Sequence, residues 1–483
     1  MPTVLCLLLV CAIAFAQAPA ARINPTIQEI VSAVSEERIT ATLKRLEAFG
    51  TRHVMSDQSS PEQGIGAAQR WLVKELQSYS PKLQVRTETF DMKKGSGRGA
   101  ILRDLQLANV VAVLPGEVEP DRYVMIGAHY DSLNLAHKSF STVDERVVEM
   151  AKDGVTEAEA RRYLQLVPVF RGPTDNEATA IQKIAPGVTD DGSGTAAVLE
   201  LARVMSRYKF DKSLVFIAFS AEEVGLEGAK AYVEKHKGEK IEALLNNDII
   251  GSDVSGNGHS ASGVVRVFSA SPEDSPARSL ARYVKEIGER YVPSMKVDLV
   301  FRHDRFGRGG DHTPFAQAGL AAVRLTTASE HYGNQHTKTD TFATTSVPYT
   351  TRVARINAAV SASLALAPPV PGVRFKFTSG KNKGMEVPLL GRGKSGYDAV
   401  LNWEPSAGPD LAGYSVLIRS TLAPFWEREI YVGNVNTFTL ADFSIDDVVL
   451  GVRAIDRDGN QSLVAAYESP TPATPAKGSS DKQ

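Results

Sequence analysis

Cysteine is nearly absent from this sequence of 483 residues. Its two cysteines, Cys6 and Cys11, both lie in an apolar segment at residues 4–16, which ends in Ala14-Phe15-Ala16. Such a segment is typical of a signal peptide, because it ends in small residues and is shorter than the roughly 20 residues that span a bilayer. A membrane anchor is the alternative. We therefore expect removal of residues 1–16 to leave a secreted or periplasmic chain with no disulfide and no cysteine nucleophile.

The sequence also lacks an excess of positive charge. Lysine and arginine number 54 against 56 aspartates and glutamates, for a formal net charge of -2. No basic surface is expected, which excludes non-specific binding to nucleic acid or to an anionic membrane. After signal removal no stretch is apolar enough to span a membrane. The length exceeds that of one compact core, so we expect two domains.

Strands and helices are predicted to alternate through the first two thirds of the chain. Apolar or alternating runs predict strands at residues 83–90, 109–114, 123–128, 214–219, 243–250, 264–268, 297–301 and 321–325. Helical periodicity predicts two short helices within residues 24–49 and further helices at 64–79, 195–208, 229–237, 275–291, 313–318 and 347–366. This alternation predicts an α/β fold with a mixed, mostly parallel sheet sandwiched by helices.

The pattern changes at the breaker cluster Ala367-Pro368-Pro369-Val370-Pro371-Gly372. We assign residues 23–367 to the α/β domain, with a polar, charge-rich insertion at 132–184 that contains one predicted helix at 143–166. Residues 372–468 show short strands and turns, which predict an all-β immunoglobulin-like sandwich. Residues 469–483 have no apolar pattern and are expected to be disordered.

Several acidic residues and histidines follow predicted strands, where ligands bind in open α/β sheets. Taken singly, each has a structural explanation. His129 fits a core histidine, Glu222-Glu223 an acidic helix start, and Asp190-Asp191 a capping turn before Gly192-Ser193-Gly194. Their grouping with Asp248 favours a metal site, because a mixture of imidazoles and carboxylates suits Zn²⁺ better than Mg²⁺ or Ca²⁺.

Six motifs stand in a fixed order within this domain. They are Gly127-Ala128-His129-Tyr130-Asp131-Ser132, Ala185-Pro186-Gly187-Val188-Thr189-Asp190-Asp191-Gly192-Ser193-Gly194, Ser220-Ala221-Glu222-Glu223-Val224-Gly225-Leu226, Asn247-Asp248-Ile249-Ile250-Gly251, Gly310-Asp311-His312-Thr313-Pro314-Phe315 and His336-Thr337-Lys338-Thr339-Asp340-Thr341. The order resembles the co-catalytic di-zinc exopeptidases of metallopeptidase family 28, which include secreted bacterial aminopeptidases. The resemblance extends from about residue 30 to about residue 366 and implies a zinc exopeptidase fold.

The resemblance implies two zinc ions. One would be held by His129 and Asp248, the other by Glu223 and His336, and Asp190 would bridge both. Two such ions can share a hydroxide and polarise the scissile carbonyl. The implied activity is removal of N-terminal residues from peptides or proteins.

The resemblance also implies roles for neighbouring acids. Glu222 resembles the general base that deprotonates the attacking water. Asp131 and Asp340 would orient the imidazoles of His129 and His336, respectively. Asp131 is thus a catalytic candidate beside Glu222.

The sequence departs from the family pattern at two places. Thr189-Asp190-Asp191 replaces the usual Asp-Asp-Asn, and Gln335 stands where some relatives have a tyrosine that stabilises the oxyanion. Tyr332 could substitute for that tyrosine. His312 is a further candidate for substrate contact, whereas His303 and His331 fit solvated loops.

Two other functions remain as alternatives. A related zinc carboxypeptidase or a glutaminyl cyclase-like acyl transferase would use a similar site, although the cyclases use one metal. A non-catalytic binding protein would act through the β domain, which resembles a fibronectin type III module at Val400-Leu401-Asn402-Trp403 and Leu411-Ala412-Gly413-Tyr414. The presence of all five ligands and of Glu222 argues against this last function. The β domain is then a candidate tether for the enzyme.

Overall fold

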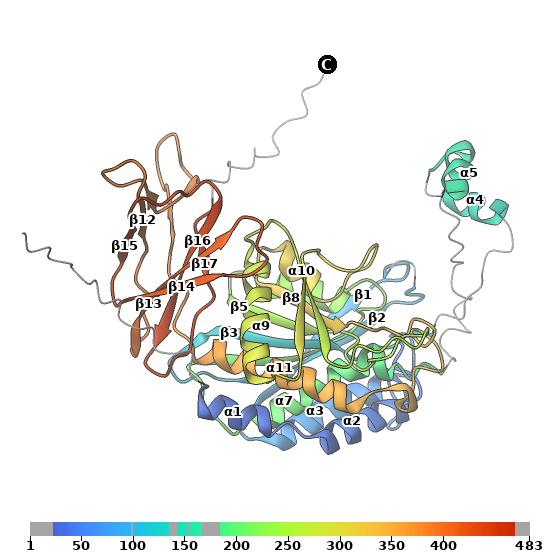
Figure 1. The fold of residues 1–483 in the computed structure, drawn as a ribbon. Helices are drawn as coiled ribbons and strands as arrows, with labels where there is room; N and C mark the ends of the chain where they lie inside the picture. Colours follow the sequence, from blue (N-terminus) through green and yellow to red (C-terminus); the bar gives the residue numbers. More distant parts are fainter. Residues whose placement is uncertain (1–22, 98–99, 135–142, 153, 167–183, 469–483) are drawn as a thin grey trace, which may run out of the picture. The chain divides into compact units, whose positions relative to one another are not determined.

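The computed structural model describes residues 23–97, 100–134, 143–152, 154–166 and 184–468 (Figure 1). The chain divides into two compact units, Ile27–Ala365 and a second unit whose described residues are 23–26 and 366–468. The predicted signal peptide and the predicted disordered tail lie outside the described residues, as does much of the insertion at 132–184.

An eight-stranded sheet forms the centre of the larger unit. Its strands are β1 (Gln84–Met92), β2 (Leu105–Leu114), β3 (Glu119–His129), β4 (Lys212–Phe219), β5 (Lys240–Asn247), β6 (Val264–Ser269), β7 (Lys296–Val300) and β8 (Ala322–Thr327), in the order β1-β2-β4-β3-β5-β8-β6-β7. The inner strands β4, β3, β5 and β8 pair in parallel, as do β6 and β7. The pairs β1/β2, β2/β4 and β6/β8 are antiparallel. The mixed, mostly parallel sheet predicted from the sequence is confirmed.

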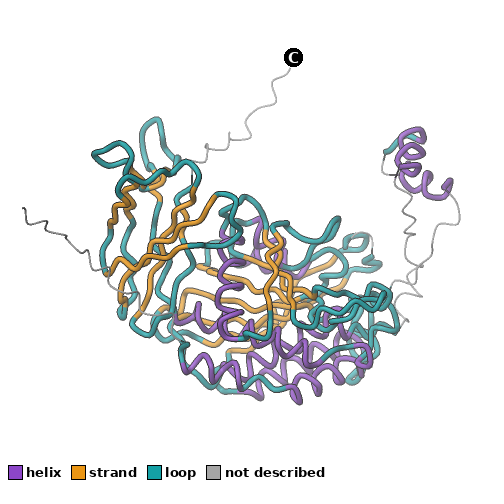
Figure 2. Tube along the Cα trace, in the orientation of Figure 1, coloured by secondary structure: helices purple, strands orange, loops and turns teal. Residues whose placement is uncertain are grey.

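Helices cover both faces of this sheet (Figure 2). They are α1 (Pro25–Ser32), α2 (Glu36–Ala48), α3 (Gly64–Tyr79), α7 (Ser193–Met205), α8 (Glu227–Lys235), α9 (Pro276–Tyr291), α10 (His312–Gln317) and α11 (Val347–Leu366), with short turns η1 (Val188–Gly192) and η2 (Phe342–Thr344). α7 packs on β3, β4 and β5, and α2 and α3 pack on α7. α8 and α10 pack on the other face, where Phe219, Tyr232 and Phe315 form a core cluster with apolar side chains of the inner strands.

Burial explains why the inner strands read as continuous apolar runs. Every residue of β4 is buried, and so are the last six residues of β3. A strand covered by helices on both faces gains stability from apolar side chains on both sides, rather than from alternation. The polar residues that follow these strands therefore mark the points where the chain leaves the core.

The insertion differs from its prediction. Instead of one helix over 143–166, the structure has α4 (Val143–Lys152) and α5 (Glu157–Leu166). The helices enclose a small core of Val147, Ala160 and Leu164. Gly154 has φ of +83° between the two helices, a conformation that ends a helix at little cost only in glycine.

The smaller unit is all-β, as predicted. Its strands are β9 (Arg374–Lys376), β10 (Glu386–Pro388), β11 (Leu390–Gly391), β12 (Ala399–Asn402), β13 (Leu411–Ser420), β14 (Arg428–Gly433), β15 (Thr437–Leu440), β16 (Val448–Asp456) and β17 (Ala465–Ala466). Sheets ordered β11-β12-β15 and β14-β13-β16-β17 enclose a core that contains Trp403 and Tyr414. Trp403 is therefore a core residue, consistent with two packed antiparallel sheets.

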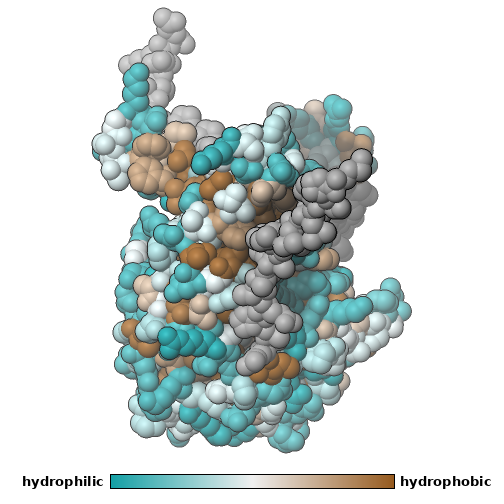
Figure 3. Space-filling view, turned by 60° about the vertical axis from the view of Figure 1, so that its left-hand side comes forward, coloured by the Kyte–Doolittle hydropathy of each residue, from teal (hydrophilic) through white to brown (hydrophobic). Residues whose placement is uncertain are grey.

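Hydrophilic side chains dominate the molecular face drawn in Figure 3, where apolar residues form separate groups. Among the described residues, no helix combines the length and the apolar character needed to cross a membrane.

Candidate metal centre

The predicted ligands meet where the inner strands end. His129 is the last residue of β3, Asp248 directly follows β5, and Glu222 and Glu223 follow β4. His336 comes from the segment after β8. Because these strands are parallel neighbours, their carboxyl ends bring the side chains to one edge of the sheet.

The carboxylate of Asp190 lies between the two histidines. Its Oδ1 is 3.2 Å from His129 Nε2, and its Oδ2 is 3.0 Å from His336 Nε2. His336 Nε2 is also 3.0 Å from Glu223 Oε2, and His129 Nε2 is 3.9 Å from Asp248 Oδ1. Each oxygen of Asp190 thus faces a different imidazole.

The donor atoms of this cluster fit a metal better than a hydrogen-bonded network. His129 Nε2 and His336 Nε2 are buried and face carboxylate oxygens at 3.2 and 3.0 Å without the angles of a hydrogen bond, and Glu223 Oε1 is buried without a partner. Buried polar atoms without partners are costly, so each needs an explanation. Two ligands of one tetrahedral zinc lie roughly 3.3 Å apart when each is about 2.0–2.1 Å from the ion. The separations around Asp190 are close to this value, and the residues fit zinc.

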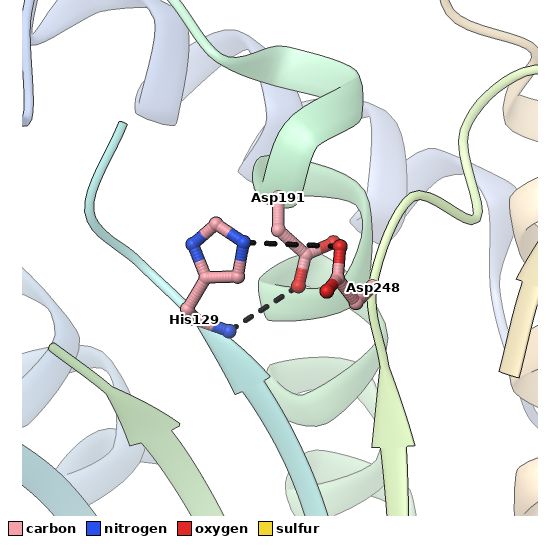
Figure 4. Close-up of side chains that lie close together, drawn as sticks. All are labelled: His129, Asp191 and Asp248. Atoms are coloured by element: carbon pink, nitrogen blue, oxygen red, sulfur yellow. Dashed lines mark hydrogen bonds and ion pairs between the residues drawn. The ribbon is translucent and has the colours of Figure 1, made fainter. Parts of the chain in front are cut away.

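Asp191 also lies next to His129, but its carboxylate contacts different atoms from those that Asp190 contacts (Figure 4). One atom each of His129, Asp191 and Asp248 would be close enough to hold one ion. However, Asp191 Oδ2 accepts a hydrogen bond from the backbone N–H of His129, and Oδ1 accepts from those of Gly194 and Ile249. Asp191 therefore ties three backbone segments together, which leaves Asp190 as the carboxylate directed at both imidazoles.

Asp131 lies beside His129, Glu222 and Glu223. Its carboxylate accepts hydrogen bonds from the backbone N–H groups of Glu222 and Glu223, and His129 Nδ1 lies 3.1 Å from its carbonyl oxygen and 3.6 Å from Oδ1. Asp131 thus links the segment that carries Glu222 and Glu223 to His129.

Asp340 contacts a different group from the one predicted. Its carboxylate oxygens accept hydrogen bonds from the backbone N–H groups of Thr189 and Asp190, at 2.8 and 3.0 Å. Asp340 therefore fixes the turn that carries Asp190, rather than the His336 ring. Sequence spacing to His336 could not reveal this, because the two partners are about 150 residues apart in the chain.

Glu222 is half-buried beside other acids. Burial raises the pKa of its carboxyl group well above the usual range, and the nearby carboxylates of Asp248, Glu223 and Asp311 raise it further. A raised pKa suits a group that must take and return a proton near neutral pH.

Asp311 was not among the predicted site residues. Its carboxylate is fully buried, neither oxygen has a hydrogen-bond partner, and burial and the charges of Asp131 and Asp248 raise its pKa. The position of Asp311 in the motif Gly310-Asp311-His312 was the feature of the sequence that could have identified it as a site residue. His312, by contrast, is buried and contacts the carbonyl of His303 through Nε2.

Arg52 was also missed, and the sequence around it contains no motif that marks it. The side chain is fully buried and donates to the carbonyl oxygens of Tyr130, Leu46, Pro186 and Gly187. Burial lowers its pKa to about 10, although four nearby carboxylates act in the opposite direction. Arg52 stays charged at neutral pH and holds the turn before Asp190.

Tyr332, the candidate substitute for the missing tyrosine, is 63% exposed. Gln335 instead donates from Nε2 to Asp190 Oδ2 at 2.9 Å.

Gly194 allows the turn of Asp190 and Asp191 to approach β5. A Cβ atom at Gly194 would lie 2.5 Å from Asp191 Oδ2 and 2.6 Å from the carbonyl of Asn247. We expect Gly194→Ala to lower the free energy of unfolding by about 1–3 kcal/mol through overpacking. Thermal melting would measure this. Gly263→Ala is the control, since its Cβ would meet only one atom, at 3.6 Å; equal melting temperatures for both variants would contradict the prediction.

Fold and site define an α/β protein with a metal centre of imidazoles and carboxylates. The sequence profile of peptidase family M28 matches residues 109–361, and the chain belongs to this family.

Known proteins with similar sequences span nearly the whole chain. A "probable zinc metalloprotease" of Pyrenophora tritici-repentis is 30% identical over 471 residues, which cover 90% of this chain and 96% of that protein. One from Pyricularia oryzae is 32% identical and covers 90% and 83%. The crystal structure of LapA from Legionella pneumophila shares the fold, with a TM-score of 0.50, 18% identity and coverage of 71% of this chain and 77% of that one.

Proposed function

We propose that this chain is a zinc aminopeptidase with two metal positions, exported from the cell. The placement of Asp190 supports the two positions, because its two oxygens lie 3.2 and 3.0 Å from different imidazoles. His129 and Asp248 would hold one zinc, and Glu223 and His336 the other, with Asp190 shared. Bound zinc would supply Lewis-acid polarisation of the scissile carbonyl and lower the pKa of the attacking water.

Glu222 is the proposed general base. It takes the proton of the attacking water and passes it to the nitrogen of the leaving amine when the peptide bond breaks. Asp131 holds the backbone of Glu222 and Glu223 through two hydrogen bonds. It therefore positions the base and a ligand together.

The charge around the centre favours a substrate amino terminus over a carboxyl terminus. Carboxylates surround Glu222 closely enough to raise its pKa. The arginines that the structure describes beside this cluster, Arg52, Arg308 and Arg324, are each bonded to protein acceptors. With zinc bound, the charges of the ligand carboxylates are offset by the ions, and the acids that are not proposed ligands would be the groups that attract a substrate ammonium group.

The activity test is a panel of aminoacyl anilides and peptides, each with a free or an acetylated amino terminus. Cleavage of only the free-amine substrates is expected. Removal of residues from the carboxyl end of acetylated peptides would instead favour the carboxypeptidase alternative. Cyclisation of an N-terminal glutamine without peptide hydrolysis would favour the cyclase-like alternative.

Removal of the metal is expected to abolish activity. A zinc chelator should lower the hydrolysis rate to less than about one hundredth, because polarisation of the carbonyl and activation of water both depend on the metal. Zn²⁺ should restore the rate, whereas Mg²⁺ should not, since imidazole ligands suit zinc. Mass spectrometry of the metal content would accompany the assay, and full activity in chelated, metal-free protein would contradict the proposal.

Export rests on the apolar segment at residues 4–16. We propose cleavage after Ala16, which N-terminal sequencing of the secreted or periplasmic protein would test. The all-β unit at 372–468 is proposed as a fibronectin type III-like module that tethers the enzyme. Deletion of this unit is expected to leave hydrolysis intact.

A further inference from the structure

A chain of polar contacts leaves the bridging carboxylate on the side away from His129. Gln335 Nε2 donates to Asp190 Oδ2 at 2.9 Å, and Gln335 Oε1 accepts from Arg308 Nη1 at 2.9 Å. Arg308 Nη1 lies 3.6 Å from Glu330 Oε1. Because arginine can only donate, it fixes the Gln335 carbonyl on its own side and directs the amide nitrogen to Asp190.

The same chain continues to the other end of the metal centre. Arg305 Nη1 donates to both oxygens of Glu330, at 3.2 and 3.1 Å, and Arg305 Nε lies 3.3 Å from Asp304 Oδ1. Arg324 Nη1 donates to both oxygens of Asp304, at 3.0 and 3.1 Å. Arg324 Nη2 is 2.9 Å from Asp248 Oδ1. An unbroken path thus joins Asp190 to Asp248 outside the metal cluster.

The charges along this path alternate in sign. After Gln335 come Arg308, Glu330, Arg305, Asp304 and Arg324, before Asp248. The side chains of Asp304 and Arg324 are fully buried, and that of Glu330 is 6% exposed. Buried charges are tolerated only when they are paired, so removing one leaves its neighbours uncompensated.

Such a network contributes little to net stability relative to apolar residues, since desolvation offsets the attraction. The network instead fixes the positions of the side chains that form it. In Arg305 and in Arg324 a single nitrogen, Nη1, contacts both oxygens of one carboxylate, while a second nitrogen of the same guanidinium group reaches the next carboxylate. Each planar guanidinium group therefore holds two carboxylates at a fixed separation.

We propose that the path Gln335, Arg308, Glu330, Arg305, Asp304 and Arg324, here called the outer brace, is a positioning device that sets the separation of Asp190 and Asp248. The inference rests on the proposed two-metal centre. Glu330 is its central residue, because it joins the arginine on the Asp190 side to the arginine on the Asp248 side. Arg324 contacts Asp248 Oδ1, the same oxygen that lies 3.9 Å from His129 Nε2. These residues act through the ligands and are not themselves catalytic.

Zinc affinity distinguishes this role from simple support of the fold. Purified holoenzyme would be titrated with a competing chelator while zinc release is measured. Gln335→Met keeps a side chain of similar length but loses the bond to Asp190. Its zinc affinity is expected to fall about 10- to 100-fold, as when other contacts that orient metal ligands are lost. Glu330→Gln is expected to lower affinity in the same direction.

Glu242→Gln is the matched control. Glu242 also lies between two cations, with Oε1 at 2.6 Å from Arg122 and Oε2 at 2.7 Å from Lys212, but it sits near the start of β5, at the opposite end of the strand from Asp248. This variant is expected to melt at a lower temperature and to keep wild-type zinc affinity.

A double variant tests whether Arg308 affects the metal centre only through its contact with Gln335. If Arg308 works through Gln335, Arg308→Met combined with Gln335→Met should bind zinc no more weakly than Gln335→Met alone. Wild-type zinc affinity in Gln335→Met would overturn the proposal, and so would fully additive losses in the double variant. Should Glu330→Gln fail to fold, the half-buried Gln335 still decides the outcome.

The zinc measurement is independent of the proposed activity. A wild-type chain that binds zinc but cleaves no free-amine substrate would contradict the aminopeptidase function and leave the brace to be judged by affinity. A single bound zinc would contradict the two-metal centre, and the affinity of that one ion in Gln335→Met would still support or overturn the brace.

Discussion

Replacement of Glu222 by glutamine is expected to lower kcat/KM by about 10²- to 10⁴-fold, the usual contribution of a general acid–base group. The amide has the same shape but cannot accept the proton of the attacking water. Zinc content should stay at the wild-type value, because Glu222 is not among the proposed ligands. Steady-state hydrolysis of an aminoacyl anilide, together with metal analysis, would measure both quantities.

The same variant is expected to be more stable than the wild type. Burial disfavours the charged form of Glu222, the neighbouring carboxylates of Asp248, Glu223 and Asp311 disfavour it further, and a neutral amide removes both costs. Glu227→Gln is the control for this comparison of stability, since Glu227 lies in the first turn of α8 and pairs with Lys230 at the surface. Wild-type activity in Glu222→Gln would remove this residue from the reaction.

Replacement of Arg52 by methionine is expected to have the largest effect on stability, about 3–5 kcal/mol. The change leaves the carbonyl groups of Tyr130, Leu46, Pro186 and Gly187 without their buried donor. It also removes the positive charge that faces Asp131, Asp190, Asp191 and Asp340. Urea denaturation would measure the free energy of unfolding.

Activity should fall with stability in this variant, because Pro186 and Gly187 directly precede the turn of Asp190. Arg70→Met is a matched control: Arg70 also donates to backbone carbonyls, those of Gln58, Ser59 and Ser60, but at an exposed position. Equal unfolding free energies for the two variants would contradict the prediction that loss of the buried Arg52 destabilises the fold more than loss of the exposed Arg70.

The sequence predicted the fold well because burial leaves a direct record in it. The inner strands β3, β4 and β5 were visible as apolar runs, and α3 and α11 begin and end at the predicted residues. The insertion was predicted less well. A single glycine, Gly154, divides its helical pattern into two, and periodicity alone does not show whether a glycine interrupts a helix or is tolerated within it.

Parts of the centre could not be predicted from the sequence. Asp340 and Gln335 act on Asp190, which is about 150 residues away, and only the folded domain brings them together. Arg52 contacts carbonyl groups, which every residue has, so its partners leave no mark in the sequence. Motifs reveal groups that perform chemistry more readily than groups that hold those residues in place.

The adjacent acids Asp190 and Asp191 have different roles, so selection is expected to act on them differently during evolution. Asp191 joins the ends of β3 and β5 to the start of α7 through backbone hydrogen bonds, whereas Asp190 faces the imidazoles. A lineage that abandoned catalysis could therefore lose the first acid freely but would remain under selection to keep the second. Inactive descendants of such a chain should be recognisable by a surviving aspartate at position 191 beside a substituted position 190.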